Sequence, residues 1–220
     1  PAMSELVKQA GPEDTVAREQ QVVRRALVFG VLGLSLLIAI AGRELDQRAI
    51  ELALRLQGRL SFVLYIAALI GPGLRARMGS AAAAWLARRR SPLYLAFALS
   101  HLIHAVWIVL YFQCTSASFS WNIPDCSGVL AFPAVAVLLY AQTPHGQRHL
   151  PARARVEASI VAYVWVQFVG FFIDRMLTPE RVALRPWYTL ALAVSAAAAF
   201  VALYPVAGRR GPAPSASPAS

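Results

Sequence analysis

Two histidines inside an apolar stretch are the residues of this sequence best suited to chemistry. His101 and His104 are three positions apart, so their imidazoles would share one face of a helix. An imidazole held inside a membrane is a candidate functional group, because its desolvation must be compensated, and it can ligate haem iron or another metal. The alternative is an uncharged pair that hydrogen-bonds to neighbouring helices.

The two other histidines, His145 and His149, are four positions apart and could share a metal ion if they lay on a helix. Pro144, Gly146 and Pro151 argue against a helix there, and no carboxylate or cysteine lies nearby in the sequence. We therefore expect these two imidazoles to be solvated or to contact lipid headgroups.

The elements that must position His101 and His104 are apolar runs long enough to cross a membrane. The chain has 220 residues, of which 58% are hydrophobic and 15% are charged, whereas soluble domains carry about 25% charged residues. Lipid leaves no partner for unpaired backbone groups, and the runs lack the alternation of barrel strands, so we expect helices. The sequence predicts an all-α membrane protein, a bundle of six transmembrane helices at Ala26–Ala41, Leu60–Leu74, Leu93–Phe112, Val129–Ala141, Ala158–Ile173 and Trp187–Val206.

The distribution of basic residues predicts the orientation of this bundle. With the N-terminus inside, the inner connections hold twice as many arginines and lysines as the outer ones, which favours two cytoplasmic termini. The polar, partly acidic stretch before the first run does not resemble a signal peptide. We expect a cytoplasmic segment at 1–25, the transmembrane domain at 26–207, and a disordered cytoplasmic tail at 208–220, in the inner membrane of a bacterium.

Both cysteines fall in the one connection without basic residues, which this orientation places outside the cell membrane. A disulfide between Cys114 and Cys126 is plausible there, because that compartment is oxidising, and two free thiols are the alternative.

Two local patterns concern helix ends, and a third predicts a short additional helix. Gly71-Pro72-Gly73 is expected to break or end the second helix. Ser91 followed by Pro92 reads as the N-cap and first position of the third helix. The segment Asp46–Leu56 places its apolar residues on one face, as in a short helix at the membrane interface.

Part of the sequence resembles a known family. Gly58 stands at the start of the second predicted helix and Gly71-Pro72-Gly73-Leu74-Arg75 at its end. Arg89-Arg90, Leu93, Ala96-Phe97 and a histidine at 101 or 104 follow. This string is similar to the ferric-reductase-like transmembrane domain, a six-helix bundle that includes the haem-binding membrane subunits of bacterial methionine sulfoxide reductase systems. The resemblance implies b-type haem that passes electrons across the membrane, with His104 best matching the haem-ligating position and His101 one turn away.

The fifth run departs from that family, whose members carry one or two histidines there. Residues Arg155–Ile173 contain none, and Gln167 lies near the expected level. His101 and His104 project from one helix face, so they cannot approach one iron from opposite sides. Methionine could substitute, but Met3, Met78 and Met176 lie outside the apolar runs or at their edges. A five-coordinate haem, a ligand from a second subunit, or no haem remain open.

The functional prediction is a membrane electron-transfer subunit that binds haem b. The sequence holds no P-loop, Rossmann fingerprint or paired CxxC, so we expect a separate redox partner, and no nucleic acid, besides the lipid bilayer. The alternatives are a haem-free membrane scaffold or accessory subunit with structural histidines, and a small transporter.

Overall fold

The computed structural model describes residues 12–41, 46–115, 123–150, 152–178 and 184–203, and within these ranges the chain is helical and contains no strand. The helices, in chain order, are α2 (Pro12–Ala41), α3 (Gln47–Met78), α4 (Ala81–Arg88), α5 (Arg90–Cys114), α6 (Ile123–Ala141), α7 (Pro144–His149), α8 (Arg153–Leu177) and α9 (Arg185–Leu203).

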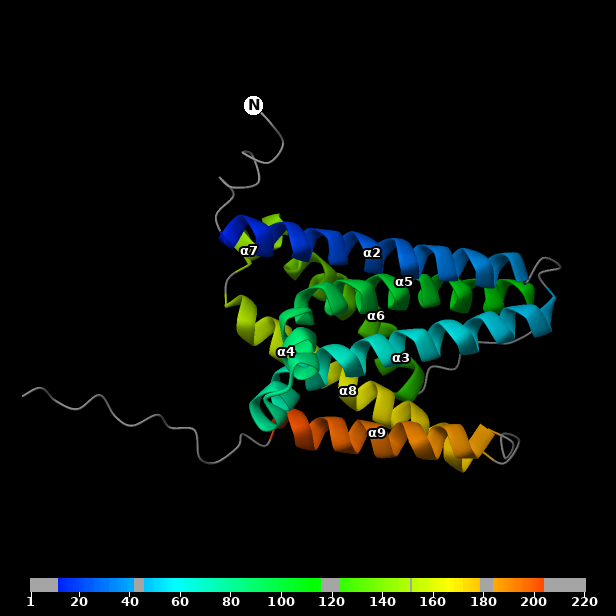
Figure 1. Ribbon diagram of the computed structural model, residues 1–220. Coiled ribbons are helices and arrows are strands. Elements are labelled where there is room, and N and C mark those ends of the chain that lie inside the picture. Colours follow the sequence, from blue (N-terminus) through cyan, green and yellow to red (C-terminus); the bar gives the residue numbers. More distant parts are fainter. Residues whose placement is uncertain (1–11, 42–45, 116–122, 151, 179–183, 204–220) are drawn as a thin grey trace, which may run out of the picture.

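The long helices run alternately up and down, and the short helices α4 and α7 lie at one common end of the bundle (Figure 1). We call this the α7 end, and the other the opposite end. Helix α3 packs against α2, α4, α5 and α9, whereas α6 bridges α5 and α8. The main core therefore forms between α3, α5, α6, α8 and α9.

Five helices of the described chain are long and apolar enough to cross a membrane: α2, α3, α5, α8 and α9. The apolar part of α6, Gly128–Ala141, is shorter than the others. The all-helical fold is compatible with the predicted membrane bundle, and five of the six predicted spans fall in helices long enough for a bilayer crossing.

The short helix expected at the membrane interface is instead the first part of the long helix α3. It runs without interruption from Gln47, where Asp46 caps it by accepting from the backbone N–H of Ala49, through the segment predicted to lie in the interface. The apolar face predicted there is nevertheless buried. Ile50 and Ala53 pack in a small second core together with Ile38 of α2 and Trp107 of α5.

The Gly-Pro-Gly sequence does not end α3 either, since the helix continues through Pro72 to Met78 and stops at Gly79, whose φ is 59°. Both glycines mark close packing instead. Gly71 lies against the backbone of α4, and a Cβ at Gly73 would collide with the carbonyl group of Val201 in α9. The prediction that this sequence breaks or ends the helix was wrong, because α3 continues through it and its glycines lie against α4 and α9.

The carboxyl end of α9 is capped from α3. The Arg77 guanidinium donates to the carbonyl oxygens of Val201 and Phe200, groups near the end of α9, where some carbonyls lack helical partners. A cation at this place also interacts favourably with the helix dipole.

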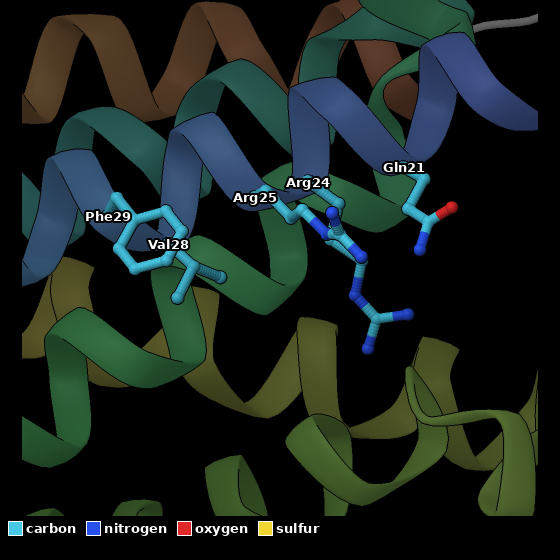
Figure 2. A pocket seen from close by; sticks show the side chains of 5 residues that line it. All are labelled: Gln21, Arg24, Arg25, Val28 and Phe29. Carbon is cyan, nitrogen blue, oxygen red and sulfur yellow. The ribbon is translucent and has the colours of Figure 1, made fainter.

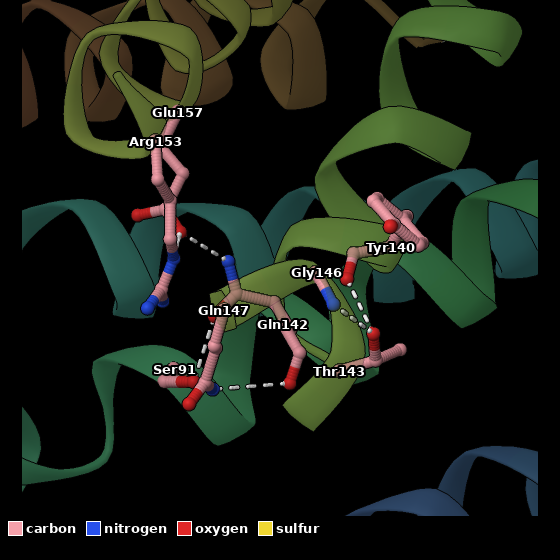
Figure 3. Close-up of polar contacts among 8 residues, drawn as sticks. All are labelled: Ser91, Tyr140, Gln142, Thr143, Gly146, Gln147, Arg153 and Glu157. Atoms are coloured by element: carbon pink, nitrogen blue, oxygen red, sulfur yellow. Dashed lines mark hydrogen bonds and ion pairs between the residues drawn. The ribbon is translucent and has the colours of Figure 1, made fainter. Parts of the chain in front are cut away.

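Helix α5 begins at Arg90, one residue before the predicted N-cap, and no side chain caps it. Ser91 has another role: its hydroxyl donates to Oε1 of Gln142 at 2.7 Å. The buried Gln142 amide donates in turn to Glu157 at 3.0 Å, and Arg153 donates to the same carboxylate at 2.6 Å (Figure 3). This chain of contacts ties together α5, the end of α6 and α8.

The segment before α8 forms a helix, α7, which the sequence argued against. Thr143 caps it by accepting from the N–H of Gly146 at 3.0 Å (Figure 3), and Pro144 occupies the first helical turn, where no N–H donor is needed. The rings of His145 and His149 lie 4.3 Å apart, and both are exposed. The described chain holds no group of three or more metal-ligating side chains.

Other predictions concern the ends of the chain and the cysteines. Helix α2 begins at Pro12, so the predicted N-terminal segment is partly the start of the first helix. The tail at 208–220 lies outside the described residues. The structure does not support the disulfide, because Cys114 is a free, exposed thiol; the side chain of Cys126 is not described.

Candidate functional site at the histidine pair of α5

His101 and His104 lie on the face of α5 that looks into the bundle. Their ring centroids are 5.9 Å apart, which confirms that they share one helix face. Their neighbours come from three other helices: α3 beside His104, and α6 and α8 beside His101. Residues from four helices therefore meet at this pair. The sequence predicted only that both histidines lie on one face of one apolar helix.

Three phenylalanine rings surround the imidazole of His101. Phe132 of α6 stacks on it at 5.2 Å between centroids, Phe97 lies at 5.4 Å, and Phe168 of α8 meets it edge-on at 5.9 Å. A porphyrin bound to this imidazole would need the space that the rings fill. His101 is therefore a poor candidate for haem ligation and a good packing residue.

His104 lies in a different environment, one turn further along α5. The α3 backbone approaches it at Gly58, where an added Cβ would stand 3.5 Å from Cε1 of the imidazole. Within the described chain its ring contact is with His101 alone. Of the two histidines, His104 is the one whose ring is not enclosed by aromatic side chains.

Both imidazoles carry a buried Nδ1 atom without a hydrogen-bond partner among the described residues. Buried polar atoms in proteins are nearly always paired, since leaving one unpaired costs about 1–3 kcal/mol. A neutral imidazole has one N–H and one acceptor nitrogen to satisfy. The described chain supplies no such partner for either Nδ1 atom.

A hydrogen-bonded cluster that the sequence reasoning missed lies beside Gly58. The Gln57 side chain, fully buried, accepts from Ser35 of α2 at 3.1 Å and donates to the hydroxyl and carbonyl oxygens of Ser100 in α5, both at 3.0 Å. Ser61 lies 2.9 Å from the Ser100 hydroxyl. This cluster fixes α2, α3 and α5 relative to one another at the level of the histidines.

The structure brings no second axial ligand against His104 within the described chain. On α8 the ring of Phe168 contacts His101, and Gln167 is partly buried. Met176 instead accepts a hydrogen bond from Thr189, and Met78 is exposed at the α7 end. Met3 lies outside the described residues. The donor set of the described chain offers one imidazole and not two axial ligands, and the α3 backbone at Gly58 lies close to the Cε1 and Nε2 atoms of that imidazole.

Comparison of the chain with models of known protein families, with curated proteins and with solved structures finds no match. The described helices are compatible with a helical, multi-pass membrane protein, since five of them are long and apolar enough to cross a membrane. The resemblance to the ferric-reductase-like family stays a prediction.

Proposed function

We propose that the chain is an integral protein of a bacterial inner membrane, with the α7 end in the cytoplasm. The support is the placement of arginines, which are enriched in cytoplasmic connections. The α7 end holds Arg18, Arg24, Arg25, Arg75, Arg77, Arg88, Arg89, Arg90, Arg148, Arg153 and Arg155, against Arg48, Arg55, Arg59, Arg175 and Arg185 at the opposite end of the described chain.

Reporter fusions test this orientation. Two kinds of reporter are joined after Ser220. The one that works only in the periplasm is expected to be inactive, and the one that works only in the cytoplasm is expected to be active. A fusion truncated in the connection after Cys114 should behave in the opposite way. Periplasmic activity of the Ser220 fusion would overturn the proposed topology.

We propose further that His104 binds haem b and that the protein carries electrons within the membrane. The observation that supports this most is a buried imidazole that faces glycine rather than an aromatic ring. Its Nε2 would bind the iron, and its Nδ1, which has no partner among the described residues, would carry the N–H. A bound haem b supplies a one-electron iron couple inside the low-dielectric bilayer. His104 would hold the iron, and the rings around His101 would keep water from that side.

The absorption spectrum of detergent-purified protein tests the haem proposal. Dithionite-reduced wild type is expected to show a Soret band with α and β bands, and His104→Ala is expected to lose them. His101→Ala is the matched control, one turn away on the same face, and should keep them. With one protein ligand, the reduced wild type should also bind carbon monoxide and shift its Soret band.

Two results would count against the proposal. Colourless wild-type protein, purified from cells supplied with haem, would reject haem binding. Loss of the bands in His101→Ala but not in His104→Ala would reject the assigned ligand. Thermal unfolding of each variant shows whether a lost band reflects a lost ligand or a lost fold.

A second candidate function is a haem-free scaffold, in which the histidines only hold helices together. The close aromatic packing around His101 and the hydrogen-bonded cluster at Gln57 favour it. Under this alternative the protein is colourless, and His101→Ala is the more destabilising histidine variant because its ring has more packing partners.

A further inference from the structure

A small surface pocket lies on α2 near the α7 end, away from the histidine pair. Its volume is about 270 Å³, and it is lined by Gln21, Arg24, Arg25, Val28 and Phe29. These positions follow the spacing i, i+3, i+4, i+7 and i+8, so one face of α2 carries all five. Figure 2 shows the two arginine side chains extending close to each other beside Gln21, with Val28 and Phe29 further along the helix.

The two arginines of this pocket lack an anionic partner within the described part of the chain. Other arginines at the same end are paired: Arg89 with Glu19, and Arg153 with Glu157. Two adjacent guanidinium groups without a carboxylate repel each other, so a bound anion would stabilise both. Guanidinium groups match phosphate oxygens with paired N–H donors, and they do this better than an ammonium group does.

The position of the pocket along α2 indicates an amphiphilic ligand. Arg24 and Arg25 are the last charged residues of α2, and the same face continues as apolar, exposed side chains. Phe29, Leu32 and Leu36 are 68%, 43% and 61% exposed. A ligand with its anionic group at the arginines would therefore have an apolar track directly beside it, directed into the membrane.

We propose that Arg24 and Arg25 bind the phosphodiester headgroup of an anionic phospholipid, whose acyl chain lies along Phe29, Leu32 and Leu36. The basic charge at this end of the bundle supports the choice of an anionic lipid, since arginines next to a membrane-spanning helix attract such headgroups. The proposal depends on membrane insertion and is independent of the haem proposal.

Titration of delipidated protein in neutral detergent tests this site. Dioleoylphosphatidylglycerol is the anionic probe, dioleoylphosphatidylcholine is the zwitterionic one, and bound lipid is counted by native mass spectrometry. Wild type is expected to bind the anionic lipid about thirty-fold more tightly than the variant Arg24→Gln/Arg25→Gln, a ratio that follows from the contribution of two basic residues at a membrane surface. The affinity for the zwitterionic lipid should be the same in wild type and in the variant.

The matched control is Arg148→Gln/Arg155→Gln, which removes the same charge from exposed arginines at the same end of the bundle. It should keep nearly the wild-type affinity for the anionic lipid. Equal losses in both double variants would mean that only the overall charge matters, and would overturn the site. If inorganic phosphate displaces the lipid at comparable concentration, the pocket binds free phosphate and the lipid proposal fails.

Discussion

Replacing Gly73 with alanine is expected to destabilise the protein by about 3 kcal/mol, because the new methyl group would collide with the backbone of α9 at Val201. A backbone carbonyl cannot move aside as a flexible side chain can, so α3 and α9 must separate. The separation also weakens the contacts of Arg77 with the carbonyl groups of Val201 and Phe200. Thermal unfolding in detergent should show a decrease of about 10 °C in the midpoint.

The control for this substitution is Gly170→Ala in α8. Nothing lies within 4 Å of the position that a Cβ would take there. Alanine at an open helical position is expected to leave stability unchanged or raise it by about 0.5–1 kcal/mol. An unchanged midpoint in Gly73→Ala, measured beside an unchanged Gly170→Ala, would show that α3 and α9 are not in close backbone contact.

The centres of the helices could be predicted from the sequence, but their ends could not. Each predicted apolar run falls largely within a helix of the structure, since hydropathy reports the part of a helix that lipid can surround. Helix α3 begins at Gln47, well before the predicted apolar run begins at Leu60. The run was predicted too short because the first turns of α3 carry charged residues. Hydropathy does not register such a polar extension, although Asp46 is a recognisable N-cap.

The short helix α7 shows a second limit. Pro144 and Gly146 were interpreted as helix breakers, yet both suit this helix. Proline is favoured in the first turn, directly after the capping residue Thr143. Gly146 is required by a close approach, since a Cβ there would collide with the carbonyl oxygen of Tyr140. The Thr-Pro signal was available in the sequence, whereas the packing of Gly146 was not.

The candidate site was predictable in part for a similar reason. His101 and His104 stand out because ionisable residues are rare inside apolar runs. The two histidines differ in their neighbours: three phenylalanine rings surround His101, and a glycine lies beside His104. Phe97 lies on α5 itself, but the other two rings and the glycine come from α6, α8 and α3. One sequence without an alignment cannot pair residues from different helices. Gln57 escaped notice because it falls just before the predicted second run, at a position assigned to the connection.

Replacing Gln57 with leucine is expected to cost about 2 kcal/mol of stability. The substitution removes three side-chain hydrogen bonds, one with Ser35 and two with Ser100, and hydrogen bonds between membrane helices contribute about 0.6 kcal/mol each on average. Leucine has a similar size, so the loss reports polar contacts rather than a cavity. Unfolding by denaturing detergent measures the change.

The control is Gln47→Leu, which removes one exposed hydrogen bond with Glu51 on the same helix and should change stability by less than about 0.5 kcal/mol. Ser35→Ala and the double variant complete a cycle, in which the coupling between Ser35 and Gln57 isolates their shared bond. Additive effects would show that this bond does not form.

The position of Gln57 also connects helix packing with the histidine site. Gln57 precedes Gly58, and its bonds to Ser100 fix the spacing of α3 and α5 one turn from His104. Without these bonds the α3 backbone is free to move relative to the imidazole. If His104 binds haem, Gln57→Leu should therefore release it faster than Gln47→Leu does, whereas a packing role of His104 predicts lower stability with no spectral change.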